Sequence, residues 1–146
     1  MKIKIISLSD VTYEYTGHIS RFNGQETAKL TSELRCTVLI DGNRMDIVVP
    51  VGFETDFGTV PKFAQCIVQA RGKADRAFIV HDWLCVTLRV SRLYGDTILF
   101  KLMRYLHTPI PQPTIAFIAV RVFYLVKTRM LLDSTTLYTD DSHNAK

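Results

Sequence analysis

The sequence predicts an α+β fold in a single domain, with a small antiparallel N-terminal sheet packed on three to four C-terminal helices. Apolar and polar residues alternate in the first third of the chain, as in half-buried strands, whereas later segments repeat apolar residues at helical spacing. The strands precede the helices, which argues against a parallel βαβ sheet. A chain of 146 residues with 47% apolar residues can build one core.

Two alternating runs joined by a turn predict the sheet. Residues 2–5 alternate, and so do residues 34–40. Asp41-Gly42-Asn43 follows, and a further run occupies residues 45–51. Asp-Gly between such runs is a strong hairpin signal, because glycine adopts positive φ without a Cβ clash. The polar segment 17–31 is expected to be a loop or a further weak strand.

Helices are predicted at residues 60–70, 74–89, 92–106 and 114–131. Thr59 is a candidate cap for the first, and Ser91 is a candidate cap for the third. Three prolines between residues 109 and 113 interrupt the pattern before the last helix. The polar residues 133–146 are expected to form a mobile tail, so that the domain spans residues 1–132.

Composition narrows the class of protein. The net charge of +4 and the pI of about 9.1 come without a block of like charges, so there is no nucleic-acid signature. Three widely spaced cysteines without a CxxC motif indicate free thiols in a reducing compartment. The N-terminus is not expected to be a signal peptide. The apolar run at 115–126, interrupted by Arg121, is shorter than the roughly 20 residues of a membrane span.

The first candidate site contains His81, Asp82 and Asp96. The first two residues interrupt an apolar helical run, and Asp96 lies on the next helix. If the two helices are antiparallel, Asp96 contacts the His81 ring, fixes its tautomer and leaves the other nitrogen to act as a base. Asp82 points to another side of its helix, where it could hold a cation. The alternative is a buried histidine whose aspartate partner only satisfies a polar group.

A second candidate is the turn at residues 54–59. Asp56 and Thr59 could supply oxygens to a hard cation, or the backbone amides before the next helix could bind an anion. Thr55 and Lys62 are further candidates in this site loop. The alternative is plain turn and capping chemistry, with an Asx-turn at Asp56 and a helix cap at Thr59.

Two further sets have a functional and a structural interpretation. Basic residues flank the candidate site and could attract a phosphate-bearing substrate, although a solvated basic face is the simpler interpretation. They are Lys62, Arg71, Lys73, Arg76, Arg89 and Arg92. Cys85, one helical turn after His81, is either a nucleophile with a histidine base or, as we favour, an apolar core residue.

The segments VPVGFETDFGTVPK, RAFIVHDWLC and SRLYGDTILFKLMR together resemble a phage and bacterial family of domains of unknown function, number 1353. That family shows a VPxGFxTDFxSVP-like turn, an HDWLY-like helix and an SRxxADxxFxxAM-like helix. The resemblance covers residues 34–124, and it implies a phage or prophage origin without implying an activity.

The pair HDWLC and RLYGDTILFKLM is similar to the helix pair of secreted phospholipases that cut the sn-2 ester, especially the prokaryotic branch. That resemblance implies that His81 is the general base for a water, that Asp82 ligates calcium and that Asp96 orients the histidine. The chain departs from the pattern at Cys85, where the family has tyrosine, and it lacks the glycine-rich calcium loop and the disulfides.

Together these observations favour a phage-encoded, metal-assisted hydrolase of an ester or phospholipid-type bond. The cation, calcium or magnesium rather than zinc, would be held by Asp82 and Asp56. The alternative is a non-catalytic structural or accessory virion protein of the head or tail. The nearly all-round apolar helix at 114–131 is expected to contact virion proteins or a second copy, with Arg121 paired or at the rim of that contact. The expected location is the bacterial host cytoplasm or the virion.

Overall fold

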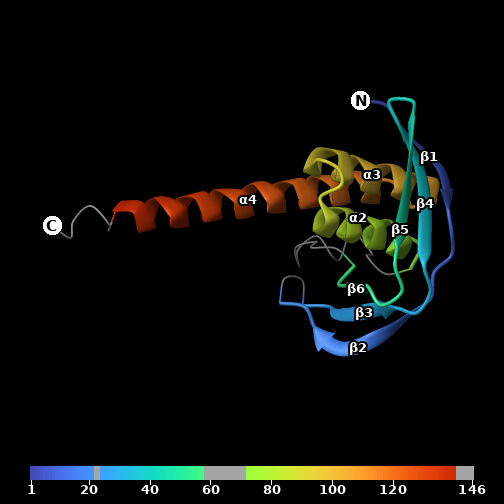
Figure 1. The fold of residues 1–146 in the computed structure, drawn as a ribbon, viewed down its shortest axis with the longest axis horizontal. Coiled ribbons are helices and arrows are strands. Elements are labelled where there is room, and N and C mark those ends of the chain that lie inside the picture. The colour runs from blue at the N-terminus through green and yellow to red at the C-terminus, as the bar shows by residue number, and fades with distance from the viewer. Residues whose placement is uncertain (22–23, 58–71, 141–146) are drawn as a thin grey trace.

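The computed structural model describes residues 1–21, 24–57 and 72–140, with side chains described as far as Leu131. Within these ranges the strands form two antiparallel sheets of three strands each (Figure 1). The first sheet has the order β1-β4-β5 and contains β1 (Ile3–Leu8), β4 (Leu34–Ile40) and β5 (Asn43–Val49). The second has the order β2-β3-β6 and contains β2 (Tyr13–Ile19), β3 (Glu26–Leu30) and β6 (Glu54–Thr55).

The predicted hairpin is confirmed between β4 and β5. Ile40 pairs with Asn43, and the two turn residues Asp41 and Gly42 have φ values of 50° and 87°. Two consecutive positive φ values match the twist of the strands they join, which is why an Asp-Gly pair is favoured there.

The second sheet was not predicted as such. β2 leaves most of its side chains exposed, so it lacks the apolar alternation that marks a half-buried strand. β3 buries only Ala28 and Leu30, within the segment that was expected to be a loop or a weak strand. Its pairing with β6, in which Ala28 lies opposite Thr55, brings the turn after the hairpin next to the helices.

The helices are α2 (Asp75–Thr87), α3 (Arg92–Tyr105) and α4 (Gln112–Asp140). Ser91 caps α3 as predicted, since its hydroxyl accepts a hydrogen bond from the Tyr94 amide at 3.4 Å. The helix predicted at 74–89 ends two residues early, at Thr87. Leu88 has a φ of 51° and is 81% exposed, because the helix ends in a left-handed residue at this point.

The helices pack in a fixed order against the first sheet. α2 contacts β4 and β5, α3 contacts β1, and α3 lies between α2 and α4. α4 is longer than the predicted helix at 114–131 and continues into the segment expected to be a tail. Its C-terminal part projects away from both sheets (Figure 1). The fold is therefore α+β, and its core is built from the first sheet, β3, Phe57, α2, α3 and the first half of α4.

Some predictions concern segments outside the described residues. These are the helix at 60–70, the candidate cap Thr59, the candidate site residue Lys62 and the flanking basic residue Arg71. Within the described ranges, none of the helices combines the length and the hydropathy that crossing a bilayer requires.

Candidate functional site

The predicted contact between His81 and Asp96 is confirmed. His81 Nε2 lies 2.8 Å from Asp96 Oδ1, which is within hydrogen-bonding distance. α2 presents the histidine and α3 presents the aspartate from facing sides. Their side chains are 1% and 0% exposed, respectively. The pair is thus a buried histidine–carboxylate contact, made where two antiparallel helices pack together.

Two arginines complete the surroundings of the Asp96 carboxylate. Arg92 Nε, one helical turn earlier on α3, lies 3.2 Å from Oδ1. Arg121 Nη1, from α4, donates a hydrogen bond to Oδ2 at 3.3 Å. Burying a carboxylate is costly unless cations and hydrogen bonds compensate it. Asp96 therefore meets a basic side chain from each of α2, α3 and α4.

The second ring nitrogen of His81 faces Asp82. Nδ1 lies 3.9 Å from Asp82 Oδ1, which is too long for a direct hydrogen bond. Burial lowers the pKa of His81, but the Asp82 and Asp96 carboxylates and the Cys85 sulfur outweigh it and raise the pKa well above the usual value. These neighbours therefore favour the protonated ring, and His81 can act as a base only in its neutral form.

The second sheet positions the Asp82 carboxylate. Thr55, in β6, donates a hydrogen bond from its hydroxyl to Asp82 Oδ2 at 2.5 Å. The same hydroxyl accepts a hydrogen bond from the backbone amide of Phe57 at 3.0 Å. Phe57 is fully buried and has a φ of 61°, a conformation that side-chain-bearing residues seldom adopt. The turn after β6 is thus held tightly against α2, and Thr55 is a genuine member of the site.

A cavity of about 480 Å³ opens beside these groups. Residues that follow β2, residues in and next to β6, Thr27 of β3, and residues of α2 and α3 border it. Its described lining consists of Ser20, Arg21, Thr27, Phe53, Glu54, Thr55, Asp56, His81, Asp82, Cys85, Val86 and Arg92. The candidates Thr55, Asp56, His81 and Asp82 therefore line the same cavity, whereas Asp96 lies behind His81 and is absent from the lining.

The cation hypothesis rests on the oxygen atoms of this cavity. Asp56 and Asp82 supply carboxylates and Thr55 supplies a hydroxyl, a set that suits calcium or magnesium better than zinc. Asp56 also accepts a hydrogen bond from Ser20 at 3.0 Å. Among the described residues, however, no group of three or more His, Cys, Asp or Glu side chains is placed to hold a metal ion. The described residues thus supply two carboxylates, which is a partial ligand set.

Cys85 lies against His81, but not in the position of a thiol that transfers its proton to the ring. Its sulfur is 3.8 Å from Nδ1 and 3.7 Å from Nε2. Nearly equal distances to both nitrogens mean that the sulfur does not lie along the lone pair of either. Its close partner is Arg92, whose Nη1 donates to the sulfur at 2.9 Å. The prediction that Cys85 is an apolar core residue was therefore wrong, since the side chain is only partly buried and contacts Arg92.

Neither arginine was assigned to Asp96 from the sequence. Arg92 was included only in the basic flank, although its spacing of four residues from Asp96 on one helix is a signal for an ion pair. Arg121 was expected to be paired or at the rim of a contact, and it pairs with Asp96 of the same chain. Of the remaining basic flank, Arg76 pairs with Asp10, away from the cavity.

Comparison with known proteins supports the first of the two resemblances. The model of a family described as a protein of unknown function (DUF1353) matches residues 29–120, which is more than half of the chain. The matched region includes β4, β5, β6, α2 and α3, and with them Thr55, His81 and Asp96. No curated protein and no solved structure gives a significant match. The chain belongs to the DUF1353 family.

Proposed function

We propose that this protein is a hydrolase of an ester or related bond, and that His81 is its general base. The observation that carries this proposal is the placement of the ring. Asp96 Oδ1 lies 2.8 Å from His81 Nε2 and does not line the cavity, whereas His81 itself borders this cavity of about 480 Å³. A carboxylate that fixes one ring nitrogen leaves the other to take a proton from a bound water.

Each neighbour of His81 then has a defined role. Asp96 orients the ring and compensates the charge that the ring gains when it accepts a proton. Asp82, 3.9 Å from Nδ1, lies on the side where the water would be held. Since the two carboxylates favour the imidazolium, catalysis requires the neutral ring, and the rate of hydrolysis should increase as the pH rises above neutral.

A divalent cation is part of this proposal. Asp82 and Asp56 would hold it, with calcium or magnesium preferred because the ligands are oxygens. A cation at this place would polarise the carbonyl oxygen of a bound ester. A cation would also compete with the Thr55 hydroxyl for the Asp82 carboxylate.

The activity is tested with His81→Gln. The wild-type protein is expected to hydrolyse at least one member of a panel of acyl esters, phospholipid vesicles, phosphodiesters and peptides, assayed with and without calcium or magnesium. His81→Gln should reduce that rate about 100-fold or more, the usual contribution of a general base. His18→Gln is the matched control, because His18 is an exposed residue of β2 that is not among the described residues lining the cavity. A wild-type protein inactive on the whole panel would count against the proposal.

The cation is tested separately by calorimetric titration of calcium and magnesium into the wild type and Asp82→Asn. The wild type should bind and the variant should bind at least tenfold more weakly. Asp10→Asn is the control, since the Asp10 side chain is fully exposed. Equal heats for the wild type and Asp82→Asn would remove Asp82 as a ligand while leaving the role of His81 to be decided by the hydrolysis assay.

A second candidate is a structural or accessory phage virion protein, of the head or tail, in which the same residues only brace the helices. The observation that favours it is the exposed apolar surface of α4. Its large apolar side chains at 118, 122, 125 and 126 are between 50% and 56% exposed, and the helix projects from the body of the protein (Figure 1). Under either candidate, a phage origin and a location in the host cytoplasm or the virion follow from the family resemblance and are part of the proposal.

A further inference from the structure

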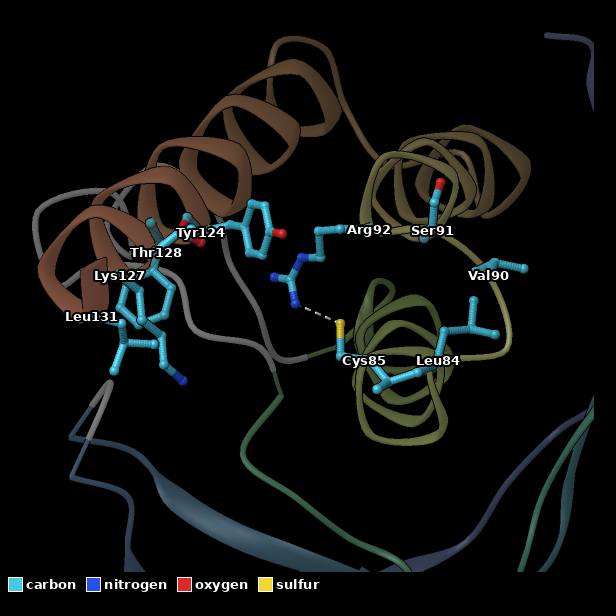
Figure 2. A pocket seen from close by; sticks show the side chains of 12 residues that line it. Leu84, Cys85, Val90, Ser91, Arg92, Tyr124, Lys127, Thr128 and Leu131 are labelled. Atoms are coloured by element: carbon cyan, nitrogen blue, oxygen red, sulfur yellow. Dashed lines mark hydrogen bonds between the residues drawn. The ribbon is translucent and has the colours of Figure 1, made fainter. Parts of the chain in front are cut away.

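A second cavity, which shares Cys85 and Arg92 with the first, lies between α2, α3 and α4 (Figure 2). Its volume is about 460 Å³, and cavities that bind small molecules usually measure about 300–1,000 Å³. Its described lining is formed by Leu84, Cys85, Leu88, Val90, Ser91, Arg92, Gly95, Phe123, Tyr124, Lys127, Thr128 and Leu131. Cys85 and Arg92 border both cavities, and the role proposed for His81 does not use this second one.

Most of this lining is apolar. Leu84 of α2, Leu88 and Val90 of the connection to α3, and Phe123 and Leu131 of α4 supply the apolar side chains of the lining. Gly95 of α3 also borders the cavity and has no side chain to occupy it. Leu88 and Leu131 at its border are 81% and 60% exposed. An apolar surface of this kind gains free energy when the body of a ligand removes it from water.

The charged groups of the lining are all positive. Arg92 and Lys127 border the cavity, and its described lining contains no aspartate or glutamate. The chain as a whole carries a net charge of +4. A cavity with apolar walls and only positive charges excludes cationic ligands and favours anionic ones.

Arg92 is the group best placed to bind an anion. Its guanidinium lies in the gap between α4 and α2 (Figure 2), 5.3 Å from the centre of the Tyr124 ring. Among the described residues, the only hydrogen bond it donates goes to the Cys85 sulfur. Its Nε is buried and has no hydrogen-bond acceptor in the described part of the chain, although Asp96 lies 3.2 Å away. A guanidinium has five N–H donors in a planar fork that matches a carboxylate, so most of its donors remain for a ligand.

We infer that this cavity binds a small amphipathic anion, with its apolar body against the leucine, valine and phenylalanine side chains and its anionic group on Arg92. Lys127 adds positive charge at the border. Because Arg92 also borders the His81 cavity, an occupant would lie directly beside the candidate catalytic site. The inference goes beyond the proposed function, since binding does not require His81 to be catalytic.

Binding is tested by calorimetry with the full-length protein and three probes below their aggregation limits. Decanoate and 2-naphthoate carry an aliphatic and an aromatic body on a carboxylate, and decyltrimethylammonium carries the aliphatic body on a cation. At least one carboxylate should bind at a single site, about tenfold or more tightly than decyltrimethylammonium, because a charge-assisted hydrogen bond contributes that much. The better carboxylate identifies the kind of apolar body that the cavity accepts.

Variants locate the site. Thr128→Trp should fill the cavity and abolish binding, whereas Val126→Trp, on the same helix but outside the lining, should not. Arg92→Gln should weaken binding about tenfold or more, and the neighbouring exposed Arg89→Gln should leave it unchanged. Circular dichroism verifies that each variant is folded, and Arg92→Lys, which retains the charge, should lose less affinity than Arg92→Gln.

Three results would overturn the inference. They are no binding of either carboxylate at millimolar concentration, equal binding of decyltrimethylammonium, and unchanged binding in folded Thr128→Trp, which would place the ligand elsewhere. The His81→Gln variant separates this inference from the proposed function. It should still bind the carboxylate even though it would have lost hydrolysis.

Discussion

Replacing Asp96 with asparagine tests the central contact of the molecule. The substitution preserves the size of the side chain, so it creates no cavity, and it removes only the negative charge. In the native protein this carboxylate is 0% exposed and lies within 2.8–3.3 Å of His81, Arg92 and Arg121. Without it, three basic groups would surround a neutral amide that does not compensate their charge.

The expected loss of stability follows from this burial. Removing one partner of a buried ion pair typically costs about 3–5 kcal/mol, because the remaining charge keeps its desolvation penalty. His81 is 1% exposed, so it loses its partner without gaining water, whereas Arg92 and Arg121 are 23% and 26% exposed and can recover some hydration. We therefore expect Asp96→Asn to lower the free energy of unfolding by about 3–5 kcal/mol at pH 7.

Urea denaturation, followed by circular dichroism in the presence of EDTA, measures this difference. Asp46→Asn is the matched control. It removes the carboxylate from an exposed pair with Arg44, in which both side chains are more than half exposed, and little change is expected. A loss below about 1 kcal/mol for Asp96→Asn, the value typical of an exposed ion pair, would refute the view that Asp96 is a buried electrostatic centre.

Three further predictions follow from the same structure. With EDTA present, the raised pKa of His81 should stabilise the fold fully below about pH 6.5, the usual histidine pKa, and this stability should be lost as the pH rises through the folded-state pKa. Urea denaturation midpoints should show this loss in the wild type and not in His81→Gln. Burial raises the pKa of the Cys36 thiol to about 12, so iodoacetamide at pH 8 should leave Cys36 unmodified in the native protein and alkylate it in urea, as peptide mass spectrometry would show. If α4 mediates self-association, the wild type should sediment as an oligomer and Val122→Glu with Leu125→Glu as a monomer; a wild-type monomer at all concentrations would contradict this.

The sheet topology could be predicted only where the pattern of burial was regular. β4 alternates buried and partly exposed residues and is followed by Asp-Gly, so both strand and turn are visible in the sequence. β2 is mostly exposed, and β6 has only two residues, so neither produces a periodic signal. Their pairing with β3 depends on contacts between distant segments, which local propensity does not encode.

The candidate site shows the same division. His81 and Asp96 were predictable, because each is a polar residue on the apolar face of a helix and the helices are neighbours in the chain. The contribution of Arg121 was not, since it lies 25 residues from Asp96 and its role depends on how α4 packs on α3. Thr55 was only one of several polar residues in a turn until β6 placed its hydroxyl on Asp82.

The electrostatics of Asp96 connect the stability of the fold with the chemistry proposed for His81. One carboxylate compensates basic groups from α2, α3 and α4, so it holds the helices together and fixes the His81 ring at the same time. Arg92 and Arg121 also interact with that carboxylate, so Asp96 stabilises the imidazolium less than it would in an isolated pair. An anion bound to Arg92 would compete with Asp96 for the guanidinium. The interaction between the Asp96 carboxylate and His81 would then become stronger. Occupation of the cavity between the three helices should therefore raise the His81 pKa further and favour the protonated ring.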